Sequence, residues 1–306
     1  MILTLTLNPS IDKSTSINGL VPEQKLRCAP PKYEPGGGGI NVSRAIKKLG
    51  GNSTALFLAG GYTGQFFQEL VAQEQLDYQV ISIEEATREN FIVVDTTTNQ
   101  QYRFGMDGPS ISENEYVAFL EKIGSFSGLS YLVGSGSLAP NVPSDFYAEV
   151  AKICKQKGVK FILDTSGKAL QEAANEGVYL LKPNLAELSA LAGVSELQLD
   201  QVDEAALHII NKGNCEVVVV SLGAAGALLV SKDIVQHVPA PTVKKRSTVG
   251  AGDSMVAGMT LGLSQGRNLL ETVRYGVACG SAATMNVGTE LCKLEDVERL
   301  YAGMKR

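Results

Sequence analysis

The run Glu216–Ser221, with the sequence EVVVVS, decides the fold class of this chain of 306 residues. Its consecutive valines place apolar side chains on both faces of a strand, which is typical of a parallel sheet covered by helices on each side. A Gly-containing turn at Leu222–Gly226 leads into a second apolar stretch. This arrangement predicts a tight hairpin.

Similar short apolar runs recur along the chain and alternate with segments of helical periodicity. Further strands are expected at Ile2–Leu7, Thr54–Leu58, Tyr131–Val133, Lys160–Leu163 and Val178–Leu181. Helices are expected at Ile40–Leu49, Gly64–Gln75, Glu113–Ile123, Ser144–Lys157, Ala205–Lys212 and Leu269–Met285. The alternation predicts an α/β fold with a central, mainly parallel sheet flanked by helices.

Two segments depart from this pattern and predict a small second sheet. Lys13–Tyr33 and Arg88–Phe104 are polar, alternating and rich in Thr, with turn signals at Asn18-Gly19 and Thr98-Asn99. An antiparallel sheet of this size cannot stand alone, so it should cover a cleft, pair with another subunit, or do both. We therefore assign residues 1–11, 36–87 and 105–306 to a main α/β domain, and residues 12–35 and 88–104 to a β lid.

The charge balance excludes several classes of function. Lys and Arg number 27 against 32 Asp and Glu, a net charge of −5, so no general attraction for nucleic acid or an anionic membrane is expected. Only two histidines are present, His208 and His237. A histidine metal cluster or a Ser-His-Asp triad is therefore not expected, and carboxylates and backbone amides should carry the chemistry.

Cysteine usage and hydropathy indicate a cytoplasmic protein. The five cysteines are odd in number, widely spaced and free of any C-x-x-C pair, which is typical of reduced thiols. Met1–Ser10 lacks a basic region, and the longest apolar run, Val217–Val230, is interrupted by polar and glycine residues. Neither a signal peptide nor a membrane span is expected.

The stretch Thr248–Ser254, with the sequence TVGAGDS, is the strongest candidate for catalysis. Gly250 and Gly252 allow consecutive amides to converge on an anion, at the start of a helix expected over Asp253–Leu263. Asp253 would then accept the proton of a hydroxyl that attacks a γ-phosphate. The simpler alternative is a glycine turn with Asp253 as N-cap.

A second glycine-rich stretch occurs at Glu34–Ala45, with the sequence EPGGGGINVSRA. It is not a P-loop, because no G-K-[ST] follows at the required spacing. Close approach of a polar ligand explains consecutive glycines better than a flexible connector does, and Asn41 would add a donor and an acceptor. At the end of the first strand, Asp12 could bind sugar hydroxyls or be a solvated turn carboxylate.

Two further motifs have both a ligand-binding and a structural interpretation. In Lys182–Glu187 (KPNLAE), Asn184 and Glu187 share one helix face and suit Mg²⁺, but they also suit a capping box. In the hairpin at Ser221–Gly226, backbone amides could face nucleotide phosphates or ribose. Small residues at Ala278–Ala282 would leave room for adenine, or would reflect close helix packing.

Three cations of the two lid segments are candidates for binding an anionic substrate. Lys25 lies in the first segment, and Arg88 and Arg103 flank the second. Arg and Lys are the usual phosphate ligands, and a folded lid would gather all three over the cleft. Scattered, solvated surface charges are the ordinary alternative.

Taken together, GGGGINVSRA, KPNLAE and TVGAGDS resemble the two signatures and the metal motif of the pfkB (ribokinase-like) carbohydrate kinases. Their order and spacing match over almost the whole chain. Within the family, TLTLNPSID, KLRCAP and SAATMNVGTELC resemble the minor bacterial 6-phosphofructokinase (phosphofructokinase-2) type. The 1-phosphofructokinases and tagatose-6-phosphate kinases share TLNPSID.

The resemblance implies a ribokinase-like fold, a nucleotide- and sugar-binding main domain, a lid that forms a homodimer contact, and specific residue roles. Asp253 would be the base, and the amides of Gly250, Ala251 and Gly252 the anion hole. Sugar ligands would be Asp12, Gly37, Gly38, Asn41 and Ser137, with Lys25, Arg88 and Arg103 on the substrate phosphate. Nucleotide contacts would be Lys182, Asn184, Ser221, Gly223, Gly226 and Ser281.

The resemblance also implies metal sites. Asn184 and Glu187 would be associated with Mg²⁺. The positions that match a K⁺ site of many relatives are Ser247, Val249, Ala283, Asn286 and Gly288. Glu290 departs from the phosphofructokinase-2 pattern, which often has Arg there.

The implied activity is the ATP- and Mg²⁺-dependent phosphorylation of the 1-hydroxyl of fructose 6-phosphate, which gives fructose 1,6-bisphosphate. A tagatose-6-phosphate kinase or a 1-phosphofructokinase would use the same machinery. A catalytically silent sugar-phosphate sensor on the same scaffold is the alternative of another class, and a nucleic-acid-binding role is disfavoured by the acidity of the chain.

Overall fold

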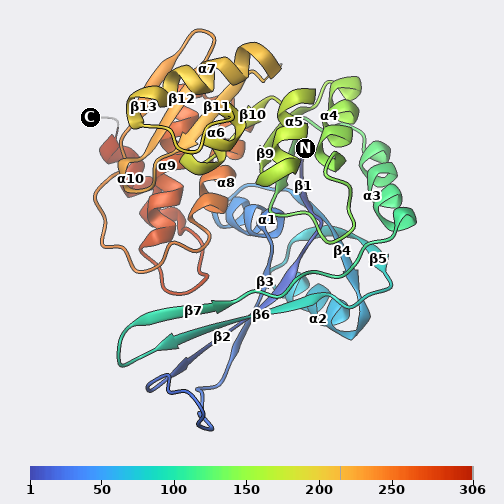
Figure 1. The fold of residues 1–306 in the computed structure, drawn as a ribbon, viewed down its shortest axis with the longest axis vertical. Helices are drawn as coiled ribbons and strands as arrows, with labels where there is room; N and C mark the ends of the chain where they lie inside the picture. Colours follow the sequence, from blue (N-terminus) through green and yellow to red (C-terminus); the bar gives the residue numbers. More distant parts are fainter. Residues whose placement is uncertain (214, 305–306) are drawn as a thin grey trace.

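The computed structural model describes residues 1–213 and 215–304, so residues 214, 305 and 306 of the expected main domain lie outside the described part. A nine-stranded sheet runs through the molecule in the order β13-β12-β11-β10-β9-β8-β1-β4-β5 (Figure 1). Its strands are β1 (Ile2–Thr6), β4 (Thr54–Gly60), β5 (Asp77–Ile83), β8 (Tyr131–Ser135), β9 (Lys160–Asp164), β10 (Leu180–Leu181), β11 (Val217–Ser221), β12 (Ala227–Ser231) and β13 (Val235–Val238).

The strands from β11 to β5 pair in parallel, and β12 and β13 add an antiparallel edge. The alternation of side chains in β11 shows why the sheet is covered on both sides. Val218 and Val220 belong to one buried core, whereas Val217 and Val219 belong to the other. A strand that is apolar at every position therefore needs a helical layer on each face.

Helices provide both layers. The face with Val218 is covered by α3 (Glu113–Ser125), α4 (Phe146–Lys157), α5 (Gly167–Glu176), α6 (Leu185–Ala192) and α7 (Val202–Gly213). The other face is covered by α1 (Gly38–Lys48), α2 (Gly61–Gln73), α8 (Ala251–Ser264) and α9 (Leu269–Thr284), with α10 (Leu294–Met304) packed on α9. Among the described residues, no helix is both long and apolar enough to span a bilayer.

The expected main-domain elements are present, with shifted ends. All six expected strands form, but β10 is reduced to Leu180–Leu181, and the helix expected to begin at Asp253 begins at Ala251. The two edge strands β5 and β13 and the helices α5 and α10 were not predicted. The sequence of β5, DYQVISI, is mostly half-exposed and so lacks the apolar run that marks the central strands.

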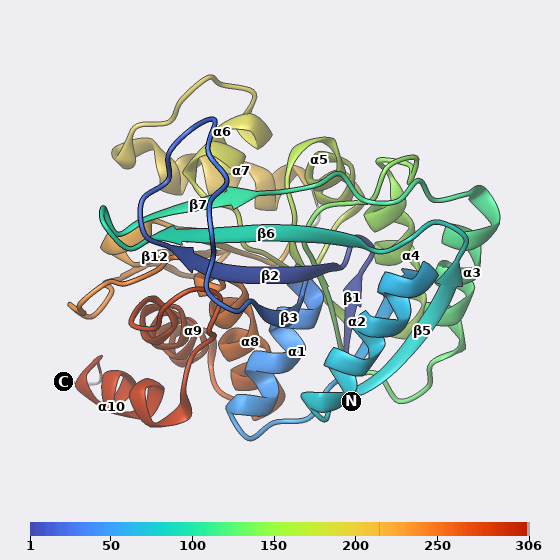
Figure 2. The same ribbon diagram turned by 90° about the horizontal axis from the view of Figure 1, so that it is seen from below.

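A second sheet of four strands forms the lid, in the order β3-β2-β6-β7 (Figure 2). Its strands are β2 (Ser10–Ile17), β3 (Lys32–Gly36), β6 (Arg88–Asp95) and β7 (Gln100–Phe104). The outer pairings are antiparallel as expected, but the central pair, β2 and β6, runs parallel. β2 follows β1, and β6 follows β5. Because β1 and β5 run parallel, the chain leaves both at the carboxyl-terminal side of the main sheet, and β2 and β6 extend from there in the same direction.

The carboxylate of Asp95 ties the two lid hairpins together. It accepts hydrogen bonds from the amides of Gly19 and Leu20 at 3.2 and 3.0 Å, and from the amide of Thr97 at 2.9 Å. The hydroxyl of Thr97, which donates to the same carboxylate at 2.6 Å, and these amides hold the pKa of Asp95 far below its usual range. The long loop between β2 and β3 is thus anchored at the end of β6.

The glycines that start α1 allow this helix to lie directly on β1. A Cβ atom at Gly39 would lie 2.1 Å from the carbonyl oxygen of Leu5, and one at Gly38 would lie 2.4 Å from Ser135 Oγ. No side chain fits at such distances, so the backbone of α1 can approach the main sheet only with glycine at these positions.

We expect Gly39→Ala to lower the free energy of unfolding by about 2 kcal/mol or more, because the methyl group overpacks against the β1 backbone. Gly124→Ala is the matched control: Gly124 lies in α3, and a methyl group added there would have no neighbour within 4 Å, so this variant should gain up to about 1 kcal/mol from helix propensity. Urea denaturation of both variants tests the pair. Equal effects would contradict the close approach of α1.

Candidate active site

The carboxylate of Asp253 lies where α1, β8 and the start of α8 meet. Its Oδ2 accepts a hydrogen bond of 3.0 Å from Asn41 Nδ2, and its Oδ1 accepts a longer one of 3.4 Å from Ser135 Oγ. Gly250 is the N-cap of α8, with φ at +71°, and Asp253 forms no capping hydrogen bond. The N-cap interpretation of Asp253 therefore does not hold in this structure.

The backbone before Asp253 presents free donors. Within the described residues, the amides of Gly250 and Gly252 have no main-chain acceptor, and the amide of Ala251 makes only a long contact of 3.4 Å to Thr248 O. Three consecutive amides at the N-terminus of a long helix favour an anion. The expected anion hole and its neighbouring carboxylate are thus brought together.

Burial changes the proton affinity of Asp253. Its pKa is raised to about 6, mainly by desolvation and also by the nearby charge of Asp164, while the hydrogen bonds of Asn41 and Ser135 and the charge of Lys182 oppose the rise. A carboxylate with a pKa near 6 is mostly ionised at neutral pH and is still basic enough to take a proton.

Asp164 and Ser135 are site residues that the sequence analysis missed. Asp164 ends β9 and forms an ion pair of 3.1 Å with the buried Lys182, and both side chains lie next to Gly252. Ser135 ends β8. The available signal was their position, because polar residues at the carboxyl ends of parallel strands collect at one edge of the sheet.

A cavity of about 540 Å³ opens beside this edge. Its lining contains the predicted nucleotide residues Lys182, Ser221, Gly223, Gly226 and Ser281, together with Thr248, Ala251 and Gly252. Gly280, one of the small residues expected to leave room for adenine, also lines the cavity. Unpredicted lining residues follow β13 or belong to α8 and α9: Ala240, Pro241, Thr242, Val243, Lys245, Met255, Val277 and Thr284. The anion hole at one end and small or apolar side chains beyond it fit a nucleotide that carries phosphates.

The polar residues expected to bind the sugar gather where the lid strands leave the main sheet. Asn8, Asp12, Arg88 and Asn90 contact or act on one another there, and we refer to this group as the cleft residues. Asp12 Oδ1 accepts hydrogen bonds from Ser10 Oγ at 2.9 Å and from Asn90 Nδ2 at 3.2 Å. Burial raises the pKa of Asp12, although these bonds and the charge of Arg88 oppose the effect. Asp12 is therefore a half-buried strand residue held in place by neighbours, and the alternative of a solvated turn carboxylate does not hold.

Close contacts of backbone and side chains surround the cleft residues. Gly37 has φ at +112°, and a Cβ atom there would lie 2.6 Å from Thr6 Cγ2. Ser137 accepts a hydrogen bond of 3.4 Å from Asn8 Nδ2. Asn8 was not singled out from the sequence, and its buried Oδ1 has no partner among the described residues.

Of the three expected phosphate-binding cations, only Arg88 lies among the cleft residues. Its guanidinium donates to Asn8 O at 2.9 Å and to Met106 O at 2.8 Å, and it acts electrostatically on Asp12. Lys25 lies exposed in the loop between β2 and β3, and Arg103 lies exposed on the edge strand β7. Nothing in the described part of the chain holds these two side chains against the cleft residues.

The Asn184–Glu187 pair forms the capping box. Asn184 Oδ1 accepts from the amide of Glu187 at 2.9 Å, and the amide of Asn184 donates to Glu187 Oε2 at 2.8 Å. Burial and the charge of Asp164 raise the pKa of Glu187. With Asn184 Oδ1 engaged, a magnesium ion would be reached through water, from Glu187 Oε1 and from Asp164.

The residues expected at a K⁺ site come together from two segments. Ser247 Oγ donates to Gly288 O at 2.8 Å, and the amide of Ser247 donates to Thr284 O at 3.3 Å. These bonds place Ser247 and Val249, which precede the anion hole, beside the segment that holds Ala283, Asn286 and Gly288. Backbone carbonyls gathered in this way suit a large monovalent cation. Glu290 is engaged with Lys293 at 3.1 Å.

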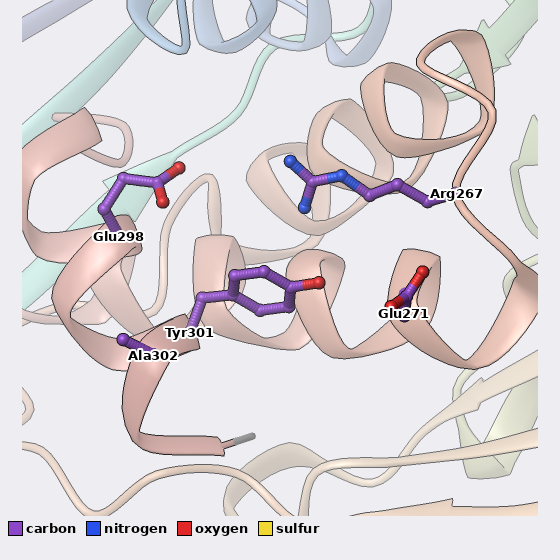
Figure 3. A pocket seen from close by; sticks show the side chains of 5 residues that line it. All are labelled: Arg267, Glu271, Glu298, Tyr301 and Ala302. Carbon is purple, nitrogen blue, oxygen red and sulfur yellow. The ribbon is translucent and has the colours of Figure 1, made fainter. Parts of the chain in front are cut away.

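A separate cavity of about 410 Å³ lies beside α9 and α10, and Figure 3 shows the side chains that line it. The guanidinium of Arg267 lies over the ring of Tyr275, 4.0 Å from its centroid, and Tyr275 Oη donates to Glu298 at 3.2 Å. The lining contains none of the site residues predicted from the sequence. We assign the chemistry to the cavity beside Asp253.

Comparison with known proteins decides the family. Residues 5–296 match the family described as pfkB family carbohydrate kinase. The chain belongs to this family. It is 46% identical to the ATP-dependent 6-phosphofructokinase isozyme 2 of Escherichia coli, over 100% of this chain and 99% of that protein. The 1-phosphofructokinase of Bacillus subtilis is 35% identical, over 100% of this chain and 99% of that protein.

Solved structures agree with this assignment. The Escherichia coli phosphofructokinase-2 crystal structure in complex with potassium has a TM-score of 0.96 at 45% identity, covering 100% of this chain and 99% of that chain. The same enzyme in complex with fructose-6-phosphate has a TM-score of 0.94 at 43% identity, with the same coverage. The ribokinase-like fold expected from the sequence is confirmed.

The raised pKa of Asp253 predicts the pH dependence of this kinase. A base must be ionised to accept a proton, so kcat should fall as the pH drops through about 6. Asp253→Asn should lower kcat at pH 8 by at least about a hundredfold, leave nucleotide binding largely intact, and abolish the acidic limb of the profile. Coupled ADP-release assays and nucleotide titrations provide these values.

Thermal unfolding of the same variant is the folding control. Because the pKa of Asp253 in the folded protein lies above the ordinary aspartate value of 3.8, ionisation of Asp253 costs stability as the pH rises through this range. Asp253→Asn should therefore unfold at a temperature no lower than that of the wild type at pH 8. Near-normal turnover in a folded variant would contradict the assignment of the base.

Proposed function

We propose that the chain transfers the γ-phosphate of ATP to the 1-hydroxyl of fructose 6-phosphate and releases fructose 1,6-bisphosphate and ADP. The observation that carries the proposal is the position of Asp253, which lies between the nucleotide-sized cavity and the polar residues Asp12 and Arg88 at the base of the lid. The 46% identity to an ATP-dependent 6-phosphofructokinase over the whole chain supports the choice of sugar.

The residues of the chain account for each part of the transfer. Asp253 accepts the proton of the 1-hydroxyl as its oxygen attacks the γ-phosphorus in line. The amides of Gly250, Ala251 and Gly252 stabilise the charge on the transferred phosphoryl group. Lys182, held by Asp164 at 3.1 Å, supplies a fixed cation on the nucleotide side. Mg²⁺, when bound, neutralises charge on the nucleotide phosphates.

The sugar is bound from three sides in this proposal. Asp12 and the backbone at Gly37 and Gly38 hold its hydroxyls, Ser137 adds a hydroxyl contact, and Arg88 meets the phosphate that the substrate already carries. Lys25 and Arg103, exposed on the lid, would complete the phosphate site on lid closure or from a second copy of the chain. Closure would also exclude water from the γ-phosphate.

A potassium ion fits the carbonyls of residues 247–249 and 283–288, since the two segments are joined by hydrogen bonds from Ser247. A cation at this position would act on the anion hole through Val249. The similar Escherichia coli enzyme was solved in complex with potassium. Glu290, which departs from the family pattern, forms an ion pair with Lys293 at 3.1 Å.

The competing functions are less well supported. A 1-phosphofructokinase or a tagatose-6-phosphate kinase would use the same base, but the 1-phosphofructokinase of Bacillus subtilis is only 35% identical. A silent sensor would not need a carboxylate whose proton affinity is tuned between an anion hole and the proposed sugar ligands. The net charge of −5 disfavours nucleic acid and anionic membranes as partners. We place the enzyme in the cytoplasm.

A panel of phosphosugars tests the proposed reaction. The expected result is a kcat/KM for fructose 6-phosphate at least about tenfold above those for tagatose 6-phosphate, fructose 1-phosphate and free fructose, measured with ATP and Mg²⁺. Arms with K⁺ and with Na⁺ show whether the carbonyl site affects turnover. A preference for an unphosphorylated sugar would remove the role of Arg88, and absence of ADP release with every sugar would favour the sensor.

We also propose that the lid forms a homodimer contact. Phe91 and Phe104 are direct neighbours on β6 and β7, and both are partly exposed, at 36% and 48%. Leu20 and Val21, in the loop after β2, add exposed apolar surface at 39% and 44%. A sheet with unpaired edges and exposed apolar side chains is stabilised by a second copy.

Phe104→Asp should therefore shift the protein toward monomer, because it places a charge in the proposed contact. Leu199→Asp is the matched control, since Leu199 is an exposed leucine at 70% outside the lid. Sedimentation velocity at several protein concentrations distinguishes the two variants. A monomeric wild type, or a Phe104→Asp variant that sediments as the wild type does, would contradict the lid contact.

A further inference from the structure

A buried guanidinium contacts Asn41, the residue whose amide donates a hydrogen bond to Asp253. Arg44, in α1, has a side chain that is only 3% exposed. Its Nη1 donates to Asn41 Oδ1 at 3.3 Å and to Pro35 O at 3.2 Å, and its Nη2 donates to Glu34 at 3.0 Å and to Glu74 at 2.8 Å. The two terminal nitrogens thus have four acceptors on three elements.

The contact with Asn41 fixes which way its amide faces. A guanidinium has only donors, so the group that Asn41 turns toward Arg44 must be its carbonyl oxygen. The NH₂ group then faces Asp253, where Nδ2 lies 3.0 Å from Oδ2. A reversed amide would set two donors against each other at Arg44 and two oxygens against each other at Asp253.

Through Glu34, Arg44 is also linked to the segment 283–288, which is proposed to bind K⁺. Glu34, in β3, is 7% exposed and accepts a hydrogen bond of 2.6 Å on its second oxygen from Thr289 Oγ1. Thr289 is also buried and directly follows Gly288, whose carbonyl accepts from Ser247 Oγ at 2.8 Å. A continuous chain of polar contacts therefore joins this segment to the base through Glu34, Arg44 and Asn41.

We propose that Arg44 is a positioning residue for phosphoryl transfer, which fixes the amide of Asn41 so that its NH₂ group holds Asp253 in one orientation. This inference rests on the proposed function. Glu34 and Thr289 hold the guanidinium in turn. The arrangement keeps the carboxylate aligned with the incoming hydroxyl through a residue that touches neither substrate nor phosphate.

A role of Arg44 in stability alone would not require the shape of its side chain. Buried ion pairs add little net stability compared with apolar packing, and a lysine ammonium can contact both Glu34 and Glu74. Only the planar fork can hold these carboxylates and the Asn41 oxygen together. The role in positioning therefore depends on the shape of the guanidinium, whereas a role in stability depends mainly on its charge.

The test is a double-mutant cycle with Arg44→Lys and Asn41→Ala. Arg44→Lys should lower kcat by about tenfold to a hundredfold and leave the KM for ATP within about twofold. Asn41→Ala should cause a loss of similar size. If Arg44 acts through Asn41, the double variant should be no slower than the slower single variant, because coupled residues are not additive.

Glu74→Gln is the matched control, because it removes a charge next to the same guanidinium and keeps an oxygen acceptor. It should leave kcat within about twofold of the wild type. Wild-type turnover in Arg44→Lys, or losses that multiply in the double variant, would overturn the proposal. If Arg44→Lys does not fold, the pair Arg44→Met and Glu34→Gln removes the buried charges together and serves in the same cycle.

Failure of this inference is separable from failure of the proposed function. The cycle is run with whichever phosphosugar the wild type phosphorylates best. A wild type that prefers another sugar corrects the proposed substrate, and the coupling between Arg44 and Asn41 is still measured. A wild type that phosphorylates fructose 6-phosphate with no coupling between the two positions overturns only the role of Arg44.

Discussion

The site depends on keeping one ionised carboxylate in a poorly solvated position. Desolvation, with the charge of Asp164, pushes the pKa of Asp253 upward, and directed hydrogen-bond donors, with the charge of Lys182, oppose this rise. Asn41, 212 positions away in the sequence, and Ser135, 118 positions away, supply these donors. The fold must therefore bring α1, β8 and the start of α8 together before Asp253 has its two hydrogen-bond donors. The glycines of α1 allow this, since any side chain at Gly39 would push α1 away from β1.

The same constraint separates the two halves of the reaction. On one side, free amides and Lys182 face the nucleotide-sized cavity. On the other side lie the polar residues Asp12 and Arg88. In the proposed reaction, the carboxylate between them takes its proton from a hydroxyl on the side of Asp12 and Arg88, and the phosphoryl group comes from the side of Lys182.

Much of this could be predicted from the sequence, for physical reasons. Fully apolar runs such as Val217–Val220 can only be buried on both faces, and glycines before a helix signal close backbone approach, so the sheet and the anion hole were predictable. Asp164, Ser135 and Arg44 were not predicted as site residues, because their roles arise from neighbours far along the chain. The capping box at Asn184 and the exposure of Lys25 and Arg103 depend on side-chain geometry, which spacing does not determine. The parallel pairing of β2 and β6 arises because both strands leave the main sheet at the carboxyl ends of its parallel strands. Local turn residues contain no information about this pairing.

That pairing also has a consequence for how the molecule assembles. Ser10 in β2 lies opposite Arg88 in β6, and the intervening chain contains β4 and β5 of the main sheet. Closing so long a loop is entropically costly until those strands are in place. The four-stranded sheet should therefore form late during folding and exchange its amide protons early, well before the main sheet opens. A four-stranded sheet that opens at low free energy, while the main sheet stays folded, is suited to admit a sugar and then enclose it.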